Sequence, residues 1–159
     1  MNCEFAGEKI APFNPSSHDA IEEAISLLRL DKNDLVYDLG CGDARFLIKA
    51  SIESKAKGIG IEYDPKFHAR ALANVKANGL SDCVVIKHGD ALSCDFSEAS
   101  ALYIYLLPKG IQLLQEKLEH FVKSGGRIAS NMFGIPNLKP VKISNVKGSK
   151  VFLYNRTSL

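Results

Sequence analysis

The chain has 159 residues, a length that suits one domain with its own core and leaves no comfortable room for a second. Hydrophobic residues make up 46% and charged residues 24%, so the composition excludes disordered and fibrous proteins. The formal net charge of +2 is too small to predict nucleic-acid or membrane binding on its own.

The cysteines and the first residues of the chain indicate the expected compartment. Cys3, Cys41, Cys83 and Cys94 show no Cys-x-x-Cys spacing, which argues against a zinc site and suits a reducing compartment. Residues 1–13 contain acids and no long apolar run, unlike a signal or transit peptide, and no stretch approaches the length of a membrane span. We therefore expect a cytoplasmic protein that holds no metal.

Helical and extended patterns alternate along the chain. The first helix is expected to follow Pro15, with Ser16 as its N-cap and Asp19 in the capping-box position. Short apolar runs between turn residues predict strands at 35–39, 58–62, 83–87, 101–107 and 127–133. Apolar spacing and caps predict helices between these strands, at 43–52, 64–78 and 111–124. Two final extended segments, broken by Gly148, predict a closing hairpin at 139–146 and 151–155.

This alternation predicts a doubly wound α/β fold. Strands that alternate with helices form a parallel sheet with right-handed crossovers. The last two strands follow one another without a helix between them, so one of them is expected to run antiparallel. We expect a mostly parallel, seven-stranded, Rossmann-like sheet with a C-terminal antiparallel hairpin.

The loop after the first predicted strand carries the strongest functional signal. Asp38 lies at the end of that strand, and Gly40 and Gly42 let the following backbone turn tightly and approach a ligand closely. Arg45 stands where the dinucleotide fingerprint has its third glycine. A carboxylate beside this turn would repel a pyrophosphate and attract an ammonium group, such as the one on the methionine end of S-adenosylmethionine.

Acids also end the next two predicted strands. Glu62 ends the second strand, where it is placed to accept hydrogen bonds from two ribose hydroxyls. Asp90 follows the third strand, where it is placed to accept from an adenine amino group, with Ala91 near the ring. A helix cap is a rival explanation for each acid alone, but three acids at successive strand ends suit one nucleoside with an amine tail.

These segments resemble the class I S-adenosylmethionine-dependent methyltransferases, and more narrowly the small archaeal protein-lysine methyltransferases and their mitochondrial relatives. The resemblance covers nearly the whole chain and rests on these motifs: Ala11–Ser16, Val36–Arg45, Gly60–Glu62, Gly89–Asp90, Tyr105–Leu107 and Gly125–Ile128. This chain has Ala44 where that family usually has glycine. The resemblance implies a single methyltransferase domain over 1–159, with an N-terminal cap segment and helix in 1–31 and the cofactor-binding core in 32–159.

The resemblance also implies S-adenosylmethionine as cofactor and lysine side chains of a protein substrate as acceptors. Tyr105 is the candidate catalytic residue lining the acceptor channel, although a core tyrosine packed on a helix explains it equally well. The Asn-Pro-Pro-Tyr-like tetrapeptide typical of amino-methylating nucleic-acid enzymes is replaced by Tyr-Leu-Leu-Pro at 105–108. The alternatives are an RNA or small-molecule methyltransferase and a non-catalytic cofactor-binding module. The sequence predicts no membrane partner and no particular oligomeric state.

Overall fold

A computed structural model describes residues 4–5, 8–9 and 15–159, with side chains from residue 15 onward. Residues 11–14 of the N-terminal motif and Cys3 therefore lie outside the described residues. The described helices are α1 (His18–Leu28), α2 (Arg45–Ser54), α3 (Pro65–Ala77), α4 (Pro108–Lys123) and the short 3-10 helix η1 (Arg156–Ser158). No helix among these residues is long and apolar enough to cross a membrane.

The main sheet confirms the predicted fold class. Its order is β5-β4-β3-β6-β7-β9-β8, in which β9 runs antiparallel to both of its neighbours and all other pairs are parallel. The strands are β3 (Leu35–Leu39), β4 (Lys57–Glu62), β5 (Val84–His88), β6 (Ala101–Ile104), β7 (Arg127–Asn131), β8 (Lys142–Val146) and β9 (Ser149–Tyr154). A separate two-stranded ribbon that the sequence did not predict pairs β1 (Glu4–Phe5) with β2 (Glu8–Lys9).

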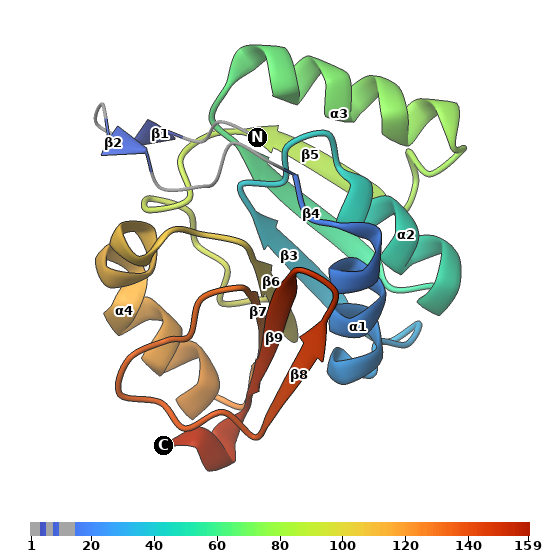
Figure 1. The fold of residues 1–159 in the computed structure, drawn as a ribbon. Helices are drawn as coiled ribbons and strands as arrows, with labels where there is room; N and C mark the ends of the chain where they lie inside the picture. The colour runs from blue at the N-terminus through green and yellow to red at the C-terminus, as the bar shows by residue number, and fades with distance from the viewer. Residues whose placement is uncertain (1–3, 6–7, 10–14) are drawn as a thin grey trace.

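Helices cover both faces of the sheet (Figure 1). Helices α1, α2 and α3 pack on one face, and their apolar side chains share a core with residues of the sheet such as Val36 and Tyr103. Helix α4 packs on the other face, over a core that includes Tyr37 and Leu102. Side chains along a strand point alternately to the two faces. Asp38 therefore faces α1 and α2, like Val36.

The structure corrects the predicted cap of the first helix. Ser17, and not Ser16, is the N-cap of α1, because its extended backbone lets its hydroxyl accept from the amide of Ala20 at 3.2 Å. Ser16 lies one residue earlier and turns its hydroxyl into the core toward Tyr103.

Two predicted boundaries also shift. The strand expected at 101–107 ends at Ile104, because Leu107 is the N-cap of α4 and Pro108 opens that helix. The helix expected from Asp43 begins at Arg45, since Ala44 has a φ of 71° in the left-handed region.

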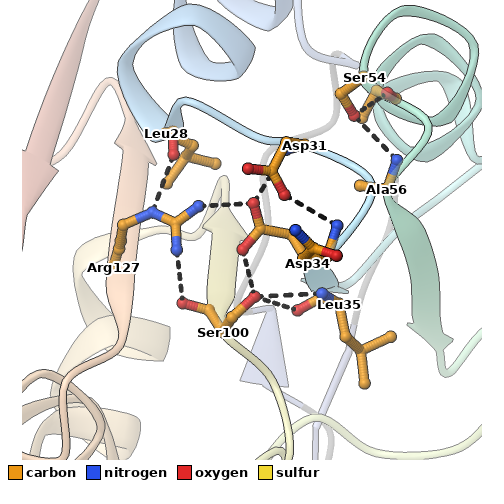
Figure 2. Close-up of polar contacts among 10 residues, drawn as sticks. Leu28, Asp31, Asp34, Leu35, Ser54, Ala56, Ser100 and Arg127 are labelled. Carbon is orange, nitrogen blue, oxygen red and sulfur yellow. Dashed lines mark hydrogen bonds and ion pairs between the residues drawn. The ribbon is translucent and has the colours of Figure 1, made fainter.

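A polar cluster ties together the elements at the amino ends of the parallel strands (Figure 2). Arg127, the first residue of β7, bonds Asp34 at 2.9 Å and the carbonyl of Leu28 at 2.8 Å. Ser100 donates to the other carboxylate oxygen of Asp34 at 2.6 Å. Hydrogen bonds from Arg127 and Ser100 lower the pKa of Asp34 although burial opposes this. The cluster fixes the end of the sheet opposite to the predicted site.

Candidate functional site

Three residues with φ in the left-handed region shape the glycine loop between β3 and α2. Gly40, Gly42 and Ala44 have φ angles of 85°, 59° and 71°. The amides of Gly40 and Cys41 both donate to the carbonyl of Ile61, at 2.8 and 3.0 Å, so the loop folds back over the end of β4. These angles explain the two glycines, since a side chain at positive φ is strained.

Gly60 allows this close approach of the loop to β4. A Cβ atom at Gly60 would lie 2.6 Å from the Sγ atom of Cys41 and 2.8 Å from Leu47. Any side chain at this position would therefore push the loop away from the sheet. Gly60 therefore shapes the site, although the sequence indicated it only as part of a motif.

Glu62, at the end of β4, supports the glycine loop. Its side chain is fully buried, and its two carboxylate oxygens accept from the amides of Gly42 at 2.7 Å and Asp64 at 3.0 Å. Burial raises the pKa of Glu62, although these hydrogen bonds oppose the rise. An ionised carboxylate has about four lone-pair positions, and a further backbone hydrogen bond from Tyr63 leaves about one of them for a predicted ribose hydroxyl.

Asp38 is a buried acid without a hydrogen-bond partner among the described residues. It lies opposite Gly60 of β4 and Tyr103 of β6, and only 4% of its surface is exposed. Burial, followed by the charges of Glu62 and Asp43, raises the pKa of Asp38 well above its ordinary value. An uncompensated buried charge costs several kcal/mol unless a partner arrives. The position therefore suits a ligand that brings a cation, and the ammonium group of an amino acid fits it.

Asp90 and Ala91 follow β5 at the same edge of the sheet. The amide of Gly89 donates to the carbonyl of Glu62 at 2.9 Å, which places Asp90 beside the end of β4. Asp90 accepts from the amide of Leu92 at 2.9 Å, so it also shapes its own turn. Ala91 is buried in the α4-side core. The contact of Asp90 and Ala91 with adenine stays a prediction.

Tyr105 lies just beyond the end of β6, beside the β3 loop. It is 8% exposed and packs in the core on the α1 and α2 side of the sheet. Burial raises the pKa of Tyr105, so its hydroxyl stays protonated at neutral pH. The predicted role of Tyr105 in acceptor binding stays a prediction. Tyr103, which lies two residues earlier and on the same face, was not predicted from the sequence. The two-residue period of side chains along a strand would have indicated it.

The arrangement brings the predicted residues to one edge of the sheet. Asp38, Glu62 and Asp90 lie at the carboxyl ends of β3, β4 and β5, which are neighbours in the sheet. In open α/β sheets, ligands bind at this edge, where the strand order reverses. No group of three or more potential metal ligands occurs in the part of the chain that the structure describes.

Comparison with known proteins agrees with this site. The model of the family described as the ANTKMT methyltransferase domain matches residues 38–142, which span the glycine loop and the strand ends. The chain belongs to this methyltransferase family. The methyltransferase is 31% identical to a protein-lysine N-methyltransferase of Saccharolobus islandicus, over 90% of this chain and 92% of that one.

Two further proteins are similar to this methyltransferase. The methyltransferase is 27% identical to the adenine nucleotide translocase lysine N-methyltransferase of Mus musculus, over 91% of its own length and 62% of the mouse protein. The crystal structure of an RNA methyltransferase from Salinibacter ruber, in complex with S-adenosyl-L-homocysteine, matches with a TM-score of 0.85 and 32% identity. That match covers 89% of this methyltransferase and 92% of the other chain.

Proposed function

We propose that this methyltransferase transfers the methyl group of S-adenosylmethionine to the side-chain amine of lysine residues in other proteins. The buried carboxylate of Asp38, which has no hydrogen-bond partner among the described residues, lies beside the glycine loop and carries the cofactor assignment. The lysine acceptor is supported by the names of the archaeal and mouse relatives.

Each proposed cofactor contact uses a different part of the ligand. Asp38 would hold the ammonium group, Glu62 a ribose hydroxyl, and Asp90 with Ala91 the adenine. Gly40 and Gly42 would let the backbone approach between them. The positions of the three acids at adjacent strand ends suit one nucleoside with an amine tail.

The bound cofactor supplies a methyl group on a positively charged sulfonium. The neutral lysine nitrogen would form a bond to the methyl carbon as the sulfur–carbon bond breaks, and S-adenosylhomocysteine would leave. The one proton released to solvent is the proton that the lysine ammonium group loses before this attack. The chain must mainly hold the amine in line with the methyl group.

The acceptor must first become neutral. Free lysine has a pKa near 10.4, so deprotonation at pH 7 costs roughly 4–5 kcal/mol. Tyr105, which is 8% exposed, would present a mostly dry aromatic surface just after β6. Such a surface lowers the pKa of an incoming ammonium group, as does the positive sulfonium. We therefore assign no dedicated base.

Labelling tests the acceptor. The purified protein is incubated with methyl-labelled cofactor and a proteome extract, and labelled bands are hydrolysed for amino-acid analysis. Labelled methyl-lysine is the expected product. Labelled protein without methyl-lysine would show that the lysine assignment is wrong, while the cofactor assignment would stand.

The structural match to an RNA methyltransferase supports RNA as a second candidate acceptor. The same extract, treated with ribonuclease before labelling, separates the two candidates. Labelling of protein survives this treatment if lysine is the acceptor, and all labelling is lost if RNA is.

A further inference from the structure

A buried polar network joins four elements next to the proposed cofactor site. Ser16, which precedes α1, and Tyr103 of β6 share a hydrogen bond of 2.5 Å between their hydroxyl oxygens. The amide nitrogen of Asn131, at the end of β7, lies 3.2 Å from the Tyr103 hydroxyl and 3.4 Å from that of Ser16. Ser149 of β9 donates to the amide oxygen of Asn131 at 2.5 Å. Ser16, Tyr103 and Asn131 are each 2% exposed.

Counting hydrogens in this network leaves one donor unused. The Ser149 hydroxyl fixes the amide of Asn131, whose two N–H hydrogens then point to Ser16 and Tyr103. Ser16 and Tyr103 share a single hydrogen bond, which consumes one of their two hydroxyl hydrogens. Either hydroxyl can be the donor of that bond, and where Tyr103 donates, the Ser16 hydrogen has no acceptor among the described residues.

The Ser16 hydroxyl lies on the same side of the sheet as Asp38, because it is bonded to Tyr103. Ser16 lines a groove of about 460 Å³ together with Asp43 and Arg45, which flank the end of the glycine loop. Its partner Tyr103 lies opposite Asp38 in the sheet. An α-amino acid carries its ammonium and carboxylate groups on one carbon, so a ligand held by Asp38 has its carboxylate close by.

We propose that the Ser16 hydroxyl donates a hydrogen bond to the α-carboxylate of S-adenosylmethionine, and that Tyr103 and Asn131 are positioning residues for it. This assignment rests on the proposed cofactor and is independent of the acceptor. Arg45 and Lys49 line the same groove and could compete, but Arg45 already makes hydrogen bonds of 3.1 and 2.7 Å to Asp43, and Lys49 pairs with Glu22 and Glu53. Helix α1 begins two residues after Ser16, and its positive end also favours an anion there.

A comparison of two ligands, one with and one without the α-carboxylate, tests the proposal. Calorimetry compares S-adenosylhomocysteine with its decarboxylated analogue, which keeps the amine, on wild type and Ser16→Ala. A hydrogen bond to a charged group corresponds to a roughly tenfold to hundredfold change in affinity. Ser16→Ala should bind S-adenosylhomocysteine more weakly than wild type by this factor, and should bind the analogue with unchanged affinity. An equal loss for both ligands, or no loss for either, would overturn the assignment.

Matched variants separate binding from folding. Ser17→Ala removes the helix cap one residue away, so it should lower thermal stability and leave both dissociation constants unchanged. Ser16→Thr keeps the hydroxyl and should retain affinity for S-adenosylhomocysteine. Tyr103→Phe should show the carboxylate-dependent loss of Ser16→Ala to a smaller degree, and a loss that is equal for both ligands would overturn its positioning role. If the wild type binds S-adenosylhomocysteine but methylates no protein, only the proposed acceptor fails.

Discussion

The carboxylate of Glu62 accepts a hydrogen bond of 2.7 Å from the amide of Gly42, so the end of β4 supports the loop that follows β3. Glu62→Ala would leave the buried amides of Gly42 and Asp64 without this acceptor. We expect a stability loss of roughly 1–3 kcal/mol and at least tenfold weaker binding of S-adenosylhomocysteine. Thermal unfolding and calorimetry measure both. A variant with unchanged stability and affinity would show that Glu62 supports neither the loop nor the ribose.

Asp38→Asn should stabilise the protein and weaken cofactor binding. Burial raises the pKa of Asp38 in the folded state, so wild type loses stability as pH rises from the ordinary value through the raised one. Asparagine carries no charge and avoids this loss, which is roughly 1.4 kcal/mol for each pKa unit. Unfolding experiments at pH 4 and pH 7 test it: the two proteins should be similar at pH 4, and the variant more stable at pH 7. A variant less stable than wild type at pH 7 would contradict it.

The affinity for S-adenosylhomocysteine should increase as the pH rises above the ordinary pKa of an aspartate side chain. The ligand ammonium pairs with ionised Asp38, whose pKa in the free protein is raised by burial, so binding at lower pH must first remove a proton. Dissociation constants measured over a pH series that starts at this ordinary value should fall for wild type. The matched control is Asp38→Asn, whose weak binding should stay flat over the same pH values. A flat wild-type profile would mean that Asp38 does not meet the ammonium group.

Arg127→Ala should destabilise the protein without changing cofactor affinity. The guanidinium bonds Asp34 and the carbonyl of Leu28, at the end of the sheet opposite to the site (Figure 2). Its side chain is 29% exposed, so we expect the lower part of the range of roughly 1.5–3 kcal/mol for charged hydrogen bonds. Urea unfolding measures the loss of stability, and calorimetry measures the affinity for the cofactor. A large change in affinity would show that the two edges of the sheet are coupled.

Tyr105→Phe should lower the rate of methyl transfer while preserving cofactor affinity. If the hydroxyl orients the incoming amine, its loss removes one neutral hydrogen bond, which corresponds to a roughly twofold to twelvefold slower reaction. Single-turnover measurements with bound cofactor report this step. An unchanged rate would leave Tyr105 as a packing residue of the core.

Much of the fold was accessible from the sequence, because its patterns are local. The parallel strands were predicted to within two or three residues, since each is a short apolar run bounded by turn residues. The ribbon of β1 and β2 was missed, because each strand has only two residues.

The predicted acids reach one edge of the sheet for a topological reason, whereas the polar network was not predicted. Asp38, Glu62 and Asp90 end parallel strands, and parallel strands end on the same side. Ser16 and Asn131 are 115 positions apart, and no local pattern marks such a contact. Ser16 and Ser17 are equally suitable N-cap residues by sequence. Only the contact with the buried phenol of Tyr103 shows that Ser16 is the one that faces the core.

The insertion of β9 between β7 and β8 has a consequence for folding during synthesis. Strand β8 is made before β9, which is its one strand partner in the described part of the chain, so β8 cannot join the sheet until β9 is available. Until Val151–Tyr154 is available, β7 also presents a bare edge of unpaired backbone groups. The nascent chain therefore passes through a late stage in which β8 is unpaired and the β7 edge is open. The edge of β3 is bare in the same way until β6 is made, so aggregation through an open strand edge is expected in both intervals.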